Sequence, residues 1–182
     1  MKKVLLVLVS ALFLSACAPT IIRGNLNTAT YEPLPSGGTY SVLQSSQSLT
    51  DRHIAELIMK EMESRGFTYV EEPESASVAV GYSYSVGNGR LGVYSSPDMV
   101  WGGQKVESYT QYPRYFQIGL IDVSRSTQKN KAVFLWQAEI QSTGTMNNMS
   151  ILADSFVPEL FNGFGKNITN DRFHIPTTVP LI

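Results

Sequence analysis

The sequence predicts an α+β fold, a two-layer sandwich in which two helices lie on one face of a mostly antiparallel sheet. Two segments with helical spacing of apolar residues, residues 50–65 and 148–164, lie far apart in the chain. Between them, residues 77–86 alternate with the period of a β-strand, and residues 114–124 and 131–141 are apolar on both faces, as in a central strand. The expected order is β-α-β-β-β-β-α, within one domain at residues 39–166.

A short strand at residues 39–44 opens this domain, and a helix at residues 50–65 follows it. The helix has one apolar stripe at helical spacing, formed by Ile54, Leu57, Ile58 and Met62. Thr50 is the expected N-cap, because its hydroxyl can accept from a backbone amide of the first turn. Gly66 is expected at the left-handed position that ends the helix.

Four further strands are predicted at residues 67–71, 77–86, 114–124 and 131–141. The last two are joined by a short polar segment, residues 125–130, which indicates a hairpin. Helical spacing returns at residues 148–164, where Pro158 removes one backbone donor. We therefore expect either a kink at Pro158 or a helix that begins late, near Ser155.

Residues 1–16 have the composition of an export signal that ends at a cysteine. Lys2 and Lys3 precede an apolar run at residues 4–13, which is shorter than the ~20 residues needed to span a bilayer. Small residues then lead into Cys17, the only cysteine of the chain. This order resembles the lipobox of bacterial lipoproteins. The resemblance implies cleavage before Cys17 and acylation of that residue, which becomes the mature N-terminus.

Ala18, rather than an aspartate, follows this cysteine. In this respect the chain is similar to lipoproteins that are sorted to the outer membrane of Gram-negative bacteria. The resemblance implies a protein that is lipid-anchored in the outer membrane and faces the periplasm. Residues 17–38 are expected to form the lipidated N-terminus and a flexible tether, because they are rich in Thr, Asn, Pro and Gly and show no sustained period. Residues 167–182 contain too much Pro and Thr for regular structure and are expected to form an irregular tail.

The charge of the chain argues against two classes of partner. Among 182 residues, 14 are basic and 15 are acidic, and cleavage of the signal removes two of the basic ones. No basic block occurs, which argues against nucleic acid and against an electrostatic hold on anionic lipid. With Cys17 acylated, no thiol remains for a disulfide, a metal ion or nucleophilic catalysis.

Residues 87–113 form a long insertion between two predicted strands, and its aromatic residues are the candidate binding residues of the chain. It is longer than the ~12–15 residues usual for a structureless loop, so we expect it to extend a hairpin or to have a function. We favour a flap that covers the otherwise exposed sheet face. Alternatively, aromatic rings among glycines stack on sugars or anchor a protein partner. These aromatic residues are Tyr94, Trp101, Tyr109 and Tyr112.

No catalytic, metal or cofactor site is predicted. Residues 87–92 spell G-x-G-x-x-G after a strand, but the residues that follow lack the helical period that a dinucleotide site requires. His53 lies on the predicted helix at residues 50–65 and His174 in the predicted tail, and neither forms part of a metal-ligating cluster in the sequence. A hydrolase with an unrecognised site is the least favoured of the functions considered.

Three segments of the predicted domain have features of a known family. The first is a helix that ends at Gly66-Phe67, and the second is a strand that carries Val and Tyr at residues 76–82. The third is a strand with Asp122 that turns into a strand with Leu135-Trp136. Together they resemble the domain-of-unknown-function 4136 group of bacterial lipoproteins. The resemblance implies the fold and the compartment, but no activity, cofactor or catalytic residue. We therefore expect a non-enzymatic binding or assembly module of the envelope, or alternatively a glycan- or peptidoglycan-binding lipoprotein that uses residues 87–113.

Overall fold

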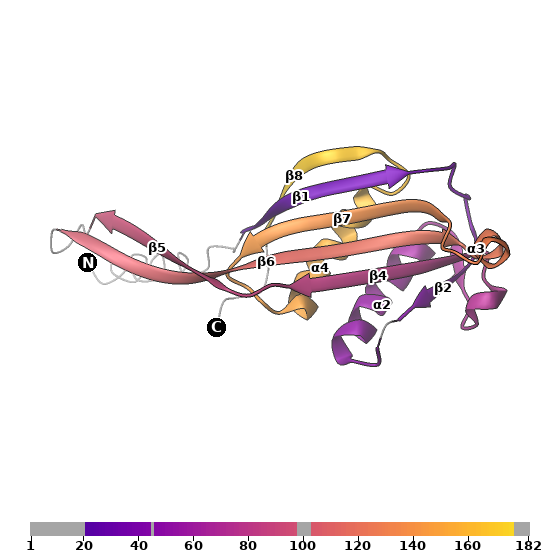
Figure 1. Cartoon of the computed structure of the whole chain (residues 1–182), viewed down its shortest axis with the longest axis horizontal. Coiled ribbons are helices and arrows are strands. Elements are labelled where there is room, and N and C mark those ends of the chain that lie inside the picture. Colours follow the sequence, from indigo (N-terminus) through magenta and orange to yellow (C-terminus); the bar gives the residue numbers. More distant parts are fainter. Residues whose placement is uncertain (1–20, 45, 98–102, 177–182) are drawn as a thin grey trace, which may run out of the picture.

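The computed structural model describes residues 21–44, 46–97 and 103–176, and Cys17 and Trp101 lie outside these ranges. The described residues form an eight-stranded sheet with the order β3-β2-β4-β6-β7-β1-β8, and β5 pairs with β6 off this path (Figure 1). The strands are β1 (Ile21–Thr30), β2 (Gly38–Leu43), β3 (Phe67–Tyr69), β4 (Val78–Val86), β5 (Arg90–Pro97), β6 (Gln104–Asp122), β7 (Phe134–Gly144) and β8 (Ile168–Pro176). The helices are α2 (Leu49–Glu63), α3 (Val123–Lys129) and α4 (Met149–Asn162).

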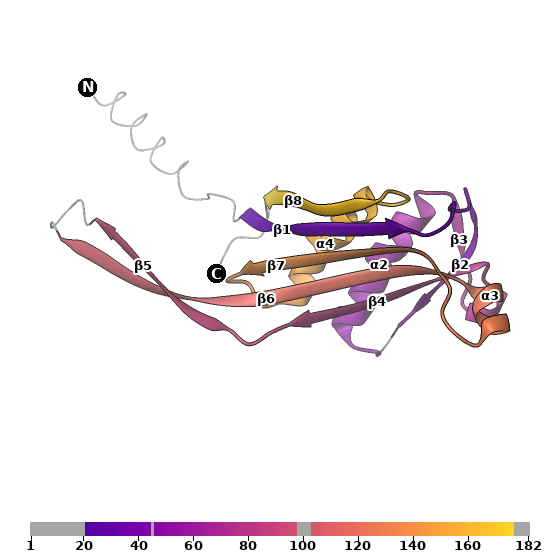
Figure 2. The ribbon, with the colours of Figure 1, turned by 45° about the horizontal axis from the view of Figure 1, so that its top comes forward.

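The two longer helices, α2 and α4, lie side by side on one face of the sheet (Figures 1 and 2). The α+β class and the helices on one face are thus confirmed. Most strand pairs are antiparallel, and only β2 pairs in parallel, with β3 and β4. No helix of the described ranges has the length and apolar character needed to cross a bilayer.

The core lies between the sheet and these two helices. Trp136 of β7 is fully buried, and its ring contacts Phe161 and Phe164 at centroid distances of 5.7 and 5.0 Å. Its indole Nε1 donates a hydrogen bond of 3.2 Å to the carbonyl oxygen of Gly163, just after α4. A buried indole therefore fixes the end of α4 over the middle of the sheet.

Helix α2 begins earlier than predicted, because its N-cap is Ser48 rather than Thr50. The Ser48 hydroxyl oxygen accepts from the backbone N–H of Asp51 at 3.1 Å. The buried Asp51 carboxylate in turn accepts from the hydroxyls of Ser46, Ser48 and Tyr82. These hydrogen bonds, the one from Ser46 above all, lower the pKa of Asp51. At the other end Gly66 has φ +84°, so its predicted left-handed conformation is confirmed.

The predicted tether contains a strand, so the sequence prediction was wrong for residues 21–30. Strand β1 lies between β7 and β8 and pairs with both. Ile22 and Leu26 are only 3% and 2% exposed, because they face the helices. The alternation escapes sequence analysis because Gly24 occupies the core-facing position between them. The ring of Phe173 fills the space that its side chain would take, since a Cβ there would lie 2.6 Å from Phe173 Cζ.

The expected irregular tail is also wrong for residues 168–176, which form β8 and place Phe173 in the core.

The late start predicted near Ser155 is wrong as well, because α4 begins at Met149 with Asn148 as its N-cap. Pro158 lies inside α4, and the carbonyl that it leaves without a helical partner belongs to the exposed Asp154. The predicted pairing of the strands on either side of residues 125–130 is confirmed, although the short helix α3 joins β6 to β7.

Candidate functional site

Residues 90–97 and 104–111 form a two-stranded ribbon, here called the arm, that projects from one end of the sheet (Figures 1 and 2). Arg90 pairs with Gln111 at its base, and Pro97 pairs with Gln104 at its far end. The flap predicted for residues 87–113 is therefore wrong. The outer sheet face is polar and includes Ser85 and Gln141, so a flap would bury little apolar surface there.

The four predicted aromatic residues do not form one platform. Tyr94 and Tyr109 share a face of the arm, because Tyr109 pairs with Gly92, two residues from Tyr94. The Tyr109 ring covers Gly92, where a Cβ would lie 2.6 Å from Tyr109 Cζ. Tyr112 is an odd number of residues from Tyr109 and therefore points to the opposite side of β6, where its ring covers Gly89. Trp101 lies outside the described residues.

The opposite face of the arm, here called the aliphatic face, pairs each of three aliphatic residues with a hydroxyl residue, Ser95, Ser108 or Thr110. Ser95 pairs with Val106, and the alternation of β5 places Leu91 and Val93 on the same side. Leu91, Val93 and Val106 are 74%, 64% and 64% exposed. The arm thus presents an aliphatic face to solvent on one side and tyrosines on the other.

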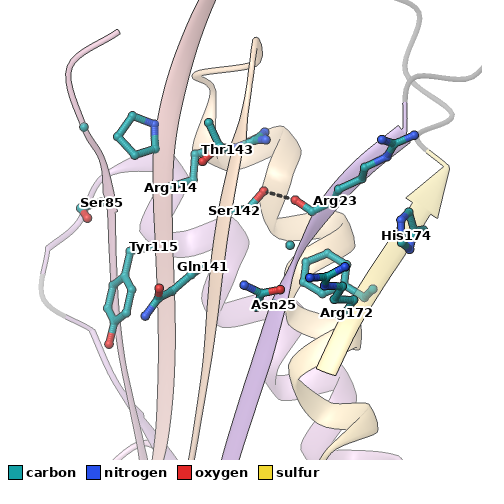
Figure 3. A pocket seen from close by; sticks show the side chains of 14 residues that line it. Arg23, Asn25, Ser85, Arg114, Tyr115, Gln141, Ser142, Thr143, Arg172 and His174 are labelled. Atoms are coloured by element: carbon teal, nitrogen blue, oxygen red, sulfur yellow. Dashed lines mark hydrogen bonds between the residues drawn. The ribbon is translucent and has the colours of Figure 1, made fainter. Parts of the chain in front are cut away.

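A groove of about 790 Å³ crosses the outer sheet face at the base of the arm (Figure 3). One row of paired residues crosses it from β4 to β8, and each residue is the register partner of the next. This row consists of Ser85, Tyr115, Gln141, Asn25 and Arg172. Next to it, Arg23 of β1 is paired with His174 of β8. The volume lies within the range usual for pockets that hold small ligands.

The groove lining is basic, with Arg23, Arg172 and His174 and no aspartate or glutamate. Within the described residues, neither arginine forms an ion pair with a carboxylate. The amides and hydroxyls that line the remainder can donate or accept hydrogen bonds. Such a surface is complementary to an anion that also carries hydroxyl or amide groups.

Two neighbouring groups set the electrostatics of the groove. Glu139, in the next row, accepts hydrogen bonds from Asn27 Nδ2, Tyr115 Oη and Gln141 Nε2 at 3.0, 3.2 and 3.3 Å. Burial, and then the negative charge of Glu139, raise the pKa of the Tyr115 phenol, which therefore stays a neutral hydrogen-bond donor. The carboxylate thus places a negative charge next to Tyr115 and Gln141, and the positive charge of the groove lies with Arg23 and Arg172 on β1 and β8.

Arg114 lies on β6 beneath the groove, and its side chain points to the helix side of the sheet with those of Phe116 and Ile118. It is 95% buried, and its Nε has no hydrogen-bond partner among the residues that the structure describes. The guanidinium packs on Gly144, where a Cβ would lie 2.1 Å from Arg114 Nη2. Burial lowers the pKa of Arg114, but not enough to remove the charge of an arginine at neutral pH. This cation adds to the positive potential at the base of the arm.

Sequence analysis missed this groove because its residues are far apart in the chain. Only the pairing of β1 with both β7 and β8 brings Arg23, Gln141 and Arg172 together. A signal was present in the alternation of polar residues at positions 23, 25 and 27, which was assigned to a tether. The described residues contain no group of three His, Cys, Asp or Glu side chains placed to hold a metal ion.

A family model described as "Domain of unknown function (DUF4136)" matches residues 27–164, which is most of the chain. The chain belongs to the DUF4136 family. The family description names no activity. The arm lies inside the matched residues, whereas Arg23, Arg172 and His174 all lie outside them. The structural unit also extends beyond the DUF4136 match, from Ile21 at the start of β1 to Pro176 at the end of β8.

Two solved structures have some similarity to this DUF4136 chain. A PDZ domain protein from Parabacteroides distasonis has a TM-score of 0.52 and 14% identity, over 92% of this chain and 42% of that protein. A PelC dodecamer from Paraburkholderia phytofirmans has a TM-score of 0.44 and 14% identity, over 79% of this chain and 98% of that one. The chain thus spans less than half of the PDZ domain protein, and that likeness shows the fold alone. No curated protein matches the chain.

Proposed function

We propose that this protein is a lipid-anchored, non-enzymatic binding module of the bacterial outer membrane that faces the periplasm and takes an anionic glycan in its groove. The order of basic, apolar and small residues before Cys17 supports the anchor. The groove supports the binding role, because it combines Arg23, Arg172 and His174 with amide and hydroxyl side chains and has no carboxylate in its lining. This combination is the observation that carries the proposal.

Peptidoglycan has the chemistry that such a groove would bind. It carries carboxylates on its peptides together with hydroxyl and acetamido groups on its sugars. An arginine can bind a carboxylate through two parallel hydrogen bonds, and side chains such as Asn25 and Gln141 can bind hydroxyl and amide groups. The glycan-binding role predicted for the aromatic insertion is thus proposed for the groove instead. Tyr112 points away from Tyr94 and Tyr109, which leaves at most two of the described aromatic residues for one sugar-binding face.

The first test is retention of the protein on purified peptidoglycan sacculi. We expect the double variant Arg23→Gln with Arg172→Gln to bind at least about tenfold more weakly. A hydrogen bond to a charged group contributes ~1.5–3 kcal/mol, and ~1.4 kcal/mol corresponds to a tenfold change in affinity. Co-sedimentation with sacculi at several protein concentrations measures the change.

The control for this experiment is Arg52→Gln. Arg52 is an exposed residue of α2 and lies in the helix layer rather than on the outer sheet face. The Arg52→Gln variant removes one positive charge and should leave the retention of the protein on sacculi unchanged. If the double variant sediments with sacculi as strongly as the unaltered protein, the groove does not bind peptidoglycan.

The second test concerns the anchor. Cys17→Ser removes the thiol that acylation requires, so we expect the variant to lose incorporation of labelled palmitate and to be absent from the outer-membrane fraction. The unaltered chain should incorporate the label and fractionate with the outer membrane. Mass spectrometry that finds a free thiol at Cys17 in the purified native protein would contradict the anchor.

A further inference from the structure

The arm projects from the same end of the sheet at which β1 begins (Figure 2). The register shows this directly, because Gly24 and Arg114 both pair with Ser142 and therefore lie at one level. Ile21 is three residues before Gly24, and Gln111, where the arm begins, is three residues before Arg114. The arm then continues away from the helix-covered part of the sheet for the eight residues from Gln111 to Gln104, about 27 Å at ~3.4 Å per residue.

The chain between the anchor and the fold is shorter than the arm. Cys17 is four residues before Ile21, and four residues span at most about 14 Å when fully extended. A bilayer that holds the acylated Cys17 therefore lies within that distance of Ile21, which is level with Gln111 and two strands, about 10 Å, away from it. Because the arm extends about twice as far as the anchor can reach, a membrane surface at this end of the sheet meets the arm along its length.

The chemistry of the arm suits the boundary between headgroups and acyl chains. Leu91, Val93 and Val106 form an exposed aliphatic face, and Tyr94 and Tyr109 are amphipathic rings of the kind enriched at this boundary. Lys105 and Glu107 form an ion pair of 2.5 Å beside the tyrosines, where headgroups and water can solvate it. Within the described ranges strand β5 pairs with β6 alone, so the backbone groups of its other edge have no strand partner there. Those groups exclude a position within the hydrocarbon core, where they would lack hydrogen bonds.

We propose that the arm lies in the headgroup region of the bilayer that holds Cys17, with its aliphatic face toward the acyl chains. The inference rests on the acylation of Cys17 proposed above. The basic groove then lies at the base of the arm, on the side of β6 that carries Tyr109 rather than Val106. The arm and the acylated cysteine form two separate contacts, so they fix the orientation of the sheet relative to the membrane.

Depth-dependent fluorescence quenching tests this placement in the full-length acylated protein, reconstituted into vesicles of phosphatidylethanolamine and phosphatidylglycerol. Acylation blocks the thiol of Cys17, so a cysteine introduced by Val93→Cys is the only reactive thiol and can carry an environment-sensitive fluorophore. Glu107→Cys places the label on the tyrosine face of the arm. Thr127→Cys places it on α3, at the opposite end of the sheet (Figure 1). All three positions are exposed, so labelling should not disturb the fold.

We expect lipids with a spin label on the upper acyl chain to quench the Val93→Cys label several-fold more than the Thr127→Cys label. The Glu107→Cys label should be quenched to an intermediate degree. If the protein floats with the vesicles but the Val93→Cys and Thr127→Cys labels are quenched equally, the arm is not at the membrane and the inference is wrong, while the anchor stands. If Cys17 carries no acyl chain, the anchor is wrong and the inference fails with it.

Discussion

A chain that begins at Tyr31 is expected to lose its cooperative unfolding transition, whereas a chain that begins at Ala18 should keep it. The shorter chain lacks β1, which is an inner strand with hydrogen-bonded neighbours on both sides. Burial of Ile22 and burial of Leu26 each contribute ~1.5–3 kcal/mol to the free energy of unfolding. The shorter chain also leaves β8 without β1, the strand with which it pairs. These losses are of the same order as the whole free energy of unfolding of a domain, ~5–15 kcal/mol.

Circular dichroism during urea titration distinguishes the two chains. If residues 17–38 were a flexible tether, both would unfold at the same urea concentration. A shared transition midpoint would therefore contradict the position of β1 in the sheet.

Trp136→Ala is expected to reduce the free energy of unfolding by about 3–5 kcal/mol, which is the usual cost of removing a large buried aromatic side chain. The substitution leaves a cavity beneath Phe161 and Phe164 and removes the hydrogen bond to the Gly163 carbonyl. Trp136→Phe is the matched variant, because it keeps an aromatic ring in the core and loses the indole donor.

Chemical denaturation of the three proteins separates packing from hydrogen bonding. For Trp136→Phe we expect a smaller loss, about 1–3 kcal/mol, the cost of a buried carbonyl without its donor. Equal losses for the two variants would mean that the hydrogen bond, and not the packing on α4, accounts for the contribution of Trp136.

The elements with a strong apolar period could be predicted from the sequence. Helix α2 and strands β4, β6 and β7 each bury a regular set of large residues, such as Ile54 and Ile58 in α2. Their positions agree with the prediction to within a few residues, apart from the first half of β6, because burial of those side chains determines the local structure. The N-cap of α2 differs from the prediction, because Ser48 and Thr50 are both hydroxyl residues near the start of the helix and Ser48 is the one that caps it.

Strands β1 and β8 could not be predicted in the same way. In β1 a glycine replaces one core-facing side chain, and in β8 Phe173 alone is buried, with 7% of its surface exposed. Strand β1 pairs with β7 and β8, both more than a hundred residues away, and β8 pairs with β1. The local sequence therefore contains little information about either strand. The same long-range pairing creates the groove, whose basic residues therefore show no cluster in the sequence.

The arrangement of the aromatic residues in the insertion at residues 87–113 could not be predicted either. The favoured prediction placed these residues in a flap over the sheet, whereas Tyr94 and Tyr109 are exposed on the arm. Their arrangement depends on strand parity, which separates Tyr109 from Tyr112 by an odd number of residues. A prediction of a hairpin for residues 87–113 would have placed Tyr109 and Tyr112 on opposite faces, because side chains alternate along a strand. A prediction of a loop or a flap does not say which side chains share a face.

The position of β1 also determines when the fold can be completed during synthesis. Strand β1 is the first described element to emerge, yet both of its partners, β7 and β8, are among the last. Until residues beyond 134 are available, Ile22 and Leu26 remain without the neighbours that shield them from water. Folding with such distant contacts is slow, because the long intervening loop must close first. The nascent polypeptide therefore exposes these two apolar residues over most of its emergence, and a stalled or truncated product without β7 and β8 would leave β1 as an unpaired strand prone to aggregation.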